Sequence, residues 1–294
     1  MRPRFASCAA LILLATGPAA AKNISITLAP TVEVSGGTFT LRVKIGNQGD
    51  EAAQSVTPTL HFQEQETRAQ TRPSLAPNES FEESLSIPVR DVKPGRWPFR
   101  LTVDYTDANQ YAFQTMHVNT VLIGRAPPPK MSVSQVAAGS ESFWRRLLSR
   151  FGLDLALDPL ATTGMVRVRL KNLAAVARTA TVSVLVPEGL EVPEALPPVP
   201  FAAWQEKTVS AQLVNRTTLP GSKYLIYVTV EYDEDGSHQT VIASGLVEIV
   251  AAQSLFQRYQ TIIWIGAGAL AVIWVTMILW RVSARVRVRP ASDR

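Results

Sequence analysis

Two acidic clusters at predicted hairpin tips are the residues of this sequence best suited to bind a metal ion. Asp104, Asp107 and Asn109 form the first cluster, and Asp233 and Asp235 belong to the second. Calcium takes about six to eight oxygen ligands, some of which Asp and Asn at alternate positions supply. Neither cluster has EF-hand spacing, and Asp-Ala-Asn and Asp-Gly also suit tight hairpin turns. We therefore assign no metal site and keep the five residues as calcium candidates beside the turn interpretation.

No other group of residues points to catalysis. The three histidines, His61, His117 and His238, lie in or beside strand patterns and share no motif. The sequence has no H-E-x-x-H, G-x-S-x-G or P-loop spacing. The single cysteine, Cys8, lies in a segment that we expect to be cleaved off. We predict a protein that is not an enzyme and needs no cofactor.

Most of the chain reads as short strands. Residues 38–45 alternate strictly between apolar and polar side chains, which is typical of a half-buried antiparallel strand. Similar runs occur at 56–62, 81–89, 99–105 and 111–123, and turn residues separate them. Short strands at this spacing predict an all-β fold with β-sandwich domains.

The second half of the chain repeats the plan of the first. Residues 43–47 (VKIGN) match 168–172 (VRLKN), and residues 101–105 (LTVDY) match 228–232 (VTVEY). A Pro-Gly pair precedes both of the latter strands. Identities in the same order favour a duplicated domain. The prolines of 126–130 favour a stiff linker that keeps the two domains spaced.

These pieces resemble the CARDB group of bacterial adhesion-related domains and the NPCBM-associated sandwich domains. The matching segments are 41–49, 75–80 and 94–107, with weaker echoes at 166–173 and 220–235. The second copy has Ala174-Ala175 where the first has the glycine of its turn. The resemblance implies immunoglobulin-like folds and extracytoplasmic binding or scaffolding, without implying a ligand.

Both ends of the chain predict export and membrane anchoring. Arg2 and Arg4, a short apolar run and Ala19-Ala20-Ala21 have the pattern of a secretory signal peptide. Residues 261–280 are 20 residues without a charge, enough for a helix to span a bilayer core of about 30 Å. The positive-inside rule places the basic tail in the cytoplasm. The tail's topology anchors are Arg281, Arg285, Arg287 and Arg289.

The net charge of the chain belongs to its ends. The sequence has 29 Lys and Arg against 24 Asp and Glu, and setting the two ends aside leaves 22 basic and 23 acidic residues. A nearly neutral ectodomain lacks the basic stripe that nucleic-acid binding requires. We therefore expect no nucleic-acid partner.

One stretch, residues 141–153, has helical rather than strand periodicity. Its apolar face consists of Phe143, Trp144, Leu147, Leu148 and Phe151, and its basic face of Arg145, Arg146 and Arg150. Because only residues 251–260 separate the second domain from the predicted span, we expect this helix near the membrane. It can lie in the lipid interface, bind a partner protein, or cap the open end of the sandwich.

The sequence thus predicts a single-pass bacterial inner- or plasma-membrane protein with a periplasmic or extracellular ectodomain. We expect a non-catalytic binding or scaffolding subunit of a cell-envelope assembly that contacts membrane lipid and a further envelope or membrane protein, or a glycan. The alternatives are an accessory component of an exporter or polysaccharide-secretion complex and, more distantly, a carbohydrate-active or other hydrolytic enzyme. The predicted segments are a signal peptide (1–21), sandwich 1 (22–125), a Pro-rich linker (126–130), sandwich 2 (131–250), a juxtamembrane linker (251–260), a transmembrane helix (261–280) and a cytoplasmic tail (281–294).

Reporter fusions test this topology. A reporter active only in the cytoplasm should work when fused after Arg294 and fail when fused after Val250, because the basic tail stays inside. The activity of the two fusions is compared at equal expression. The reverse pattern would refute the predicted orientation.

Overall fold

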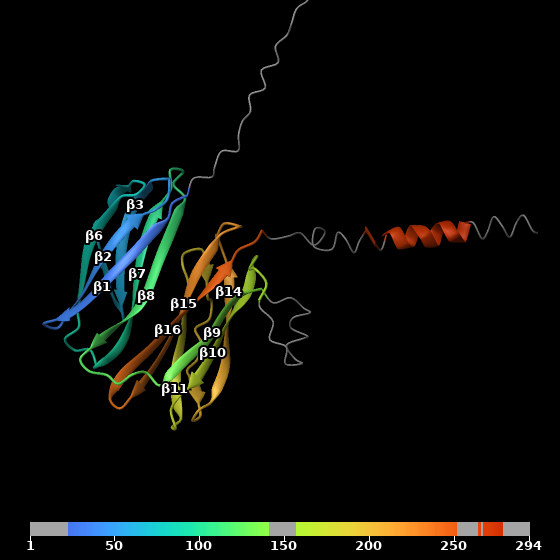
Figure 1. The fold of residues 1–294 in the computed structure, drawn as a ribbon. Helices are drawn as coiled ribbons and strands as arrows, with labels where there is room; N and C mark the ends of the chain where they lie inside the picture. Colours follow the sequence, from blue (N-terminus) through green and yellow to red (C-terminus); the bar gives the residue numbers. More distant parts are fainter. Residues whose placement is uncertain (1–22, 141–156, 252–263, 266, 279–294) are drawn as a thin grey trace, which may run out of the picture.

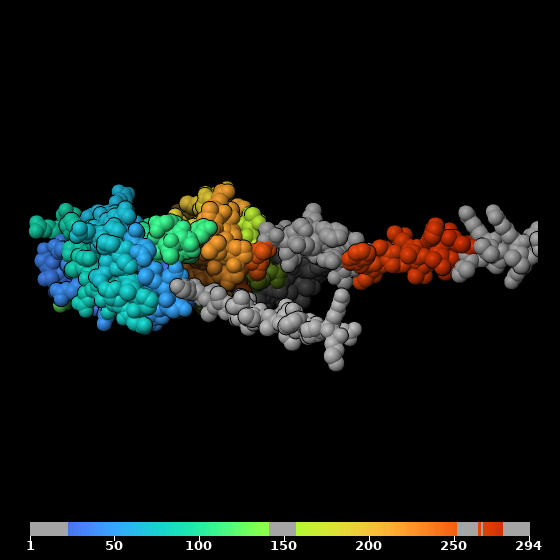
Figure 2. Space-filling model, turned by 90° about the horizontal axis from the view of Figure 1, so that it is seen from above, coloured from blue at the N-terminus to red at the C-terminus, as the bar shows by residue number. Residues whose placement is uncertain are grey.

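The computed structural model describes residues 23–140, 157–251, 264–265 and 267–278. Within these ranges the chain folds into two packed bodies built from strands, which lie side by side in Figure 1 and in the view from above in Figure 2. We call residues 23–123 the first sandwich and residues 131–250 the second sandwich. The predicted β-sandwich architecture is confirmed.

In the first sandwich, a three-stranded sheet packs against strands of a larger sheet. The strand order of the small sheet is β1-β2-β6. The small sheet consists of β1 (Ile26–Ser35), β2 (Thr38–Asn47) and β6 (Ser80–Pro88). The opposing strands are β3 (Ala53–Phe62), β4 (Gln65–Arg68), β5 (Arg72–Leu75), β7 (Gly95–Thr106) and β8 (Ala112–Ile123). All five runs predicted from alternation are strands, whereas β1 was not predicted.

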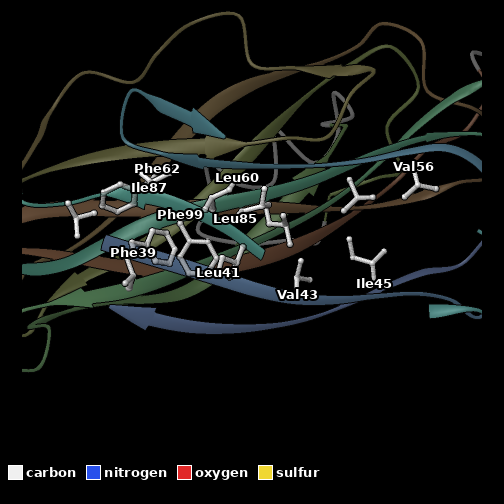
Figure 3. Close-up of a cluster of buried hydrophobic side chains, with 14 of the residues drawn as sticks. Phe39, Leu41, Val43, Ile45, Val56, Leu60, Phe62, Leu85, Ile87 and Phe99 are labelled. Atoms are coloured by element: carbon white, nitrogen blue, oxygen red, sulfur yellow. The ribbon is translucent and has the colours of Figure 1, made fainter. Parts of the chain in front are cut away.

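The core of the first sandwich follows from that alternation. In β2 the side chains of Phe39, Leu41, Val43 and Ile45 are buried, while the polar residues between them face outward. Figure 3 shows these side chains pointing toward those of the opposing sheet. The ring of Phe39 lies 5.4 Å from that of Phe99, centroid to centroid. Aromatic contacts across the two sheets therefore close this core.

The second sandwich is also a pair of sheets around its own core. Its separate sheet, in the order β12-β14-β10-β9, consists of β9 (Met131–Gly139), β10 (Thr163–Asn172), β12 (Leu190–Glu191) and β14 (Glu206–Asn215). Its remaining strands are β11 (Arg178–Leu185), β13 (Val199–Phe201), β15 (Lys223–Glu234) and β16 (Ser237–Glu248). These four strands continue into β7 of the first sandwich, so that one nine-stranded sheet runs through both bodies.

A buried asparagine ends the equivalent strand in each sandwich. The side-chain amide of Asn47 donates to the carbonyls of Glu51 and Leu75, and its Oδ1 accepts from the backbone N–H of Gly49. Asn172 repeats this pattern, donating to Val176 and Ala202 and accepting from Ala174. The exposed fractions of the two residues are 1% and 0%. Each asparagine therefore satisfies buried and partly buried backbone groups beside the end of its strand.

The proline-rich linker does not keep the sandwiches apart, and the prediction of spaced domains is wrong. The backbone N–H of Lys130 donates to the hydroxyl of Tyr232 at 2.6 Å. The Lys130 ammonium lies 2.7 Å from the Glu234 carboxylate, which Arg178 also holds. The side chain of Glu234 is only 3% exposed. These contacts fix the end of the linker to the second sandwich, and β7 of the first sandwich pairs directly with β16 of the second, so that the two sandwiches touch.

Several predictions fall on other parts of the chain. Residues 1–22, 141–156 and 279–294, which include the predicted signal peptide, the amphipathic stretch and the basic tail, lie outside the described residues. Within the predicted span, residues 264–265 and 267–278 are helical. The part of the chain that the structure describes contains no helix with the length and apolarity needed to cross a membrane.

Removing the amide of Asn172 should destabilise the fold. In Asn172→Ala, the buried N–H of Ala174 and the partly buried carbonyls of Val176 and Ala202 lose their partner. Each unpaired buried group costs roughly 1–3 kcal/mol. We expect a lower free energy of unfolding in urea denaturation. Asn119→Ala, on an exposed residue of β8, is the matched control and should leave the midpoint nearly unchanged. Equal midpoints for both variants would contradict this role.

Candidate functional site

The candidate functional site is the interdomain seam, where β7 and β8 of the first sandwich meet β11, β15 and β16 of the second. The backbones touch at one parallel bridge between Gly95 and His238, and the His238 N–H donates to the Pro94 carbonyl at 2.9 Å. A Cβ atom at Gly95 would lie 2.1 Å from the His238 carbonyl oxygen. Only glycine permits this close backbone approach.

The His238 side chain fills the junction. Its imidazole stacks on the indole of Trp97, with the ring centroids 3.7 Å apart and an interplanar angle of 12°. Nδ1 lies 3.2 Å from Asp233 Oδ1, and Nε2 lies 3.2 Å from Glu231 Oε2. The residue is 8% exposed. His238 therefore joins an aromatic residue of the first sandwich to two carboxylates of the second.

Polar contacts surround this stack and add links between the sandwiches. The Lys93 ammonium lies 3.0 Å from Asp233 Oδ2, and the Trp97 indole N–H donates to the Lys93 carbonyl at 2.8 Å. The Thr240 hydroxyl donates to the Arg96 carbonyl at 2.8 Å. Burial acts to raise the pKa of Asp233, but hydrogen bonds and charge from Lys93 and His238 hold it below its ordinary value. The carboxylate of Asp233 thus acts as a charged link across the seam.

An apolar plug closes the middle of the seam. Met116 and Val118 of β8 and Tyr227 of β15 are buried together, with Leu185 and Ile242 packed against them. The Tyr227 hydroxyl donates to the Met116 carbonyl at 3.3 Å. Burial raises the pKa of this phenol. Because the plug is small, it leaves a cavity on either side of it.

The first cavity, which we call the histidine groove, has a volume of about 670 Å³ and is lined by both sandwiches. The imidazole of His61 lies 3.4 Å from the Glu66 carboxylate and 3.4 Å from the Thr102 hydroxyl. Burial, together with the charge of Arg100, lowers the pKa of His61. The buried Nε of Arg100 has no hydrogen-bond partner among the described residues. The groove therefore presents mixed polar groups from β3 and β7 beside Glu231 of β15.

The second cavity, which we call the tyrosine groove, has a volume of about 480 Å³. The rings of Tyr105 and Phe113 stack at its edge with centroids 5.7 Å apart. Burial raises the pKa of Tyr105, whose hydroxyl is hydrogen-bonded to Thr115. The Glu188 N–H donates to the side-chain carbonyl of Gln114 at 3.3 Å. Both grooves fall within the range of roughly 300–1,000 Å³ that is typical of ligand sites.

The structure places the calcium candidates in turns and ion pairs. Asp107 Oδ1 accepts from the backbone N–H groups of Asn109 and Tyr111, at 2.8 and 2.9 Å. Asp104 accepts from the Gln114 amide at 2.7 Å. Asp235 and Gly236 both have positive φ, as a two-residue hairpin turn of type I′ requires. The described residues contain no group of three or more His, Cys, Asp or Glu side chains that could hold a metal.

The other predicted site residues lie outside the described residues. This applies to the amphipathic stretch around Trp144 and to the four tail arginines. The seam itself was not predicted. His238 had been assigned only to a strand pattern, and no local motif connects it with Trp97. The Pro-Gly pair before β7 was the one signal at this place, because a glycine ahead of a strand often marks close backbone approach.

Filling the space at Gly95 should separate the sandwiches. Gly95→Ala forces a Cβ atom against the His238 backbone, and overpacking of this kind costs roughly 1–3 kcal/mol. Gly221→Ala is the matched control, because this glycine ends the repeated Pro-Gly pair, also has positive φ, and has no described atom within 4 Å of an added Cβ. We expect small-angle X-ray scattering to give a larger radius of gyration for Gly95→Ala only. Equal radii would contradict the role of the bridge.

Comparisons with known proteins support the first sandwich. Residues 23–109, which include β1 to β7, match the family described as CARDB. No curated protein matches the chain. The family match does not extend into the second sandwich.

Solved structures give weak likenesses. Salmonella alpha-2-macroglobulin reacted with methylamine is 11% identical and covers 78% of this chain with a TM-score of 0.30, but this chain spans only 16% of its length. Red sea bream transglutaminase is 12% identical, with 76% and 31% of the two chains covered and a TM-score of 0.25. The YadV chaperone is 12% identical, with 75% and 99% covered and a TM-score of 0.27. Likenesses at these scores carry no conclusion, whereas the family match does: residues 23–109 form a CARDB domain with an immunoglobulin-like β-sandwich fold.

Proposed function

We propose that this protein is a non-catalytic binding or scaffolding protein, anchored in the membrane and exposed outside the cytoplasm as part of a cell-envelope assembly. The observation that carries the proposal is the interdomain seam. It holds two sandwiches in one fixed relation and leaves two grooves to which both contribute side chains. A surface shared between domains is a common place for a binding site.

A duplicated domain fits this role. The second sandwich repeats the buried asparagine, and it also repeats the turn before the strand that follows. Glu79 accepts from the Ala76 N–H in the first sandwich, and Gln205 accepts from the Ala202 N–H in the second, both at 2.8 Å. We infer that residues 131–250 arose by duplication of the first domain. The paired domains then supply the two walls of each groove.

The anchoring part of the proposal rests on residues 261–280. Where this segment is described, large apolar side chains are exposed along the helix, including Trp264, Leu270 and Trp274 at 64%, 68% and 65%. A helix that is apolar on all sides needs an apolar surrounding. We propose that lipid provides this surrounding, and that Arg281, Arg285, Arg287 and Arg289 remain in the cytoplasm.

The membrane-proximal position of residues 141–153 has support from the described residues that flank them. Ser140 pairs with Asp158, and Leu160 pairs with Ile249. The Val250 N–H donates to the Leu160 carbonyl at 2.9 Å. The stretch therefore leaves and re-enters the second sandwich next to the residues that lead toward 261–280. We propose that its apolar face contacts lipid or a partner there.

Photo-crosslinking in intact cells tests the binding role. A photoreactive phenylalanine at Leu225, in the tyrosine groove, should give discrete protein adducts in the membrane fraction, because this exposed side chain faces the partner. The same probe at Val176, which is 56% exposed and outside both grooves, is the control and should give none. Adducts at neither position, or glycan hydrolysis by the purified chain alone, would overturn the proposal. Adducts formed only from positions in 261–280 would favour the accessory role in an exporter.

A further inference from the structure

We propose that the tyrosine groove binds an extended peptide segment of a partner protein, which adds as a strand to the free edge of β8. The inference rests on the proposed binding function and specifies the partner of that groove. Three features of the structure lead to it: the unpaired backbone of β8, the composition of that edge, and the aromatic wall beside it.

The free edge of β8 follows from its register. β8 pairs with β7 from Thr106↔Ala112 to Gly95↔Ile123 without a register shift, and the described strands include no partner on its other side. The Met116 carbonyl accepts from the Tyr227 hydroxyl, and the Val118 backbone group is also hydrogen-bonded to this hydroxyl. The backbone groups of Met116 and Val118 therefore point away from β7.

Parity extends this result into the groove. In an antiparallel pair, residues alternate between those that exchange ladder hydrogen bonds and those whose N–H and C=O point outward. Gln114 and Ala112 have the same parity as Met116, and both line the tyrosine groove. Their N–H and C=O groups therefore face the cavity, at the spacing that an added strand requires.

The composition of β8 leaves this edge open to pairing. Its twelve residues, AFQTMHVNTVLI, include no proline and no Lys, Arg, Asp or Glu. Natural edge strands usually carry such residues, which prevent pairing with other chains. The edge strand β1 follows this rule with Pro30 and Glu33. In β8, Tyr227 covers only the centre of the edge, so the backbone at Ala112 and Gln114 is free to pair.

The walls of the groove define the peptide. Phe113 stacks on Tyr105, and a residue of an added strand directly opposite Phe113 would point to the same face. This position favours an aromatic or β-branched side chain. On the other wall, the described strands give Lys223–Leu225 of β15 no partner opposite β16, because β11 pairs only from Tyr227 onward. The groove therefore lies between two strand edges, which is geometry that recognises an extended backbone rather than a sugar ring.

Proline substitution tests the added strand. Ala112→Pro removes an outward N–H without breaking a ladder hydrogen bond to β7. Leu122→Pro is the matched control, because Leu122 has the same parity but lies outside the groove and is 44% exposed. The probe is a displayed library of random nonapeptides, selected on the full-length chain in mild detergent, with the enriched peptides titrated by fluorescence anisotropy.

We expect enriched peptides to alternate apolar and polar residues. Ala112→Pro should weaken their binding about tenfold or more, and Leu122→Pro should leave it unchanged at equal melting temperature. N-methylation of the bound peptide should abolish binding at one parity of residues only. Affinity equal to wild type in Ala112→Pro, indifference to the parity of N-methylation, or a library that yields no enriched peptide would overturn the proposal.

The two proposals fail differently. If the cellular adduct from Leu225 persists in Ala112→Pro, the added strand is wrong while the binding role stands. If the wild-type chain gives no adduct in cells, the binding role itself is wrong. Both outcomes are read in the same membrane preparation.

Discussion

The backbone contact between Gly95 and His238 is the constraint on which the arrangement of this molecule depends. It places the start of β7 against the start of β16 and so joins the strands of two sandwiches into one sheet. The stack of His238 on Trp97 and the ion pair between Lys93 and Asp233 then fix the angle at which the sandwiches meet. The apolar plug and both grooves exist because that angle leaves the two surfaces close but not fully complementary.

Within each sandwich the same physical problem has the same solution. A strand that ends at a sandwich rim leaves backbone N–H and C=O groups that neither sheet can pair, and such groups are costly when buried. Asn47 and Asn172 carry two donors and an acceptor on one short side chain, which matches the number of groups to be satisfied. The loops after β2 and β10 are therefore held by a side chain rather than by a sheet.

The strand β8 has two different surroundings along one edge. At the centre of β8, the Tyr227 hydroxyl satisfies the outward backbone groups. Closer to the 107–111 turn, the outward backbone groups of Ala112 and Gln114 border the tyrosine groove. The difference arises from the second sandwich, because β11 ends at Leu185 and so no longer covers β15 at this level. An incomplete sheet in one domain thus shapes the surface that the other domain presents.

The sequence by itself determined several of the strands and which of their faces are buried. Alternation in 38–45 predicted both β2 and its core side chains, because a half-buried strand has a period of two. It also predicted the repeated Asn and Pro-Gly positions. The strand β1 has the same alternation at Ile26, Leu28, Val32 and Val34, but Pro30 interrupts it, and a proline inside a run argues against a strand. The tertiary structure alone decided how the sandwiches meet. The prolines of the linker indicate only the stiffness of that segment, whereas the contact of Trp97 with His238 depends on two surfaces that lie far apart in the chain. For the same reason Asp233, a calcium candidate by its local pattern, proved to be an ion-pair partner across the seam.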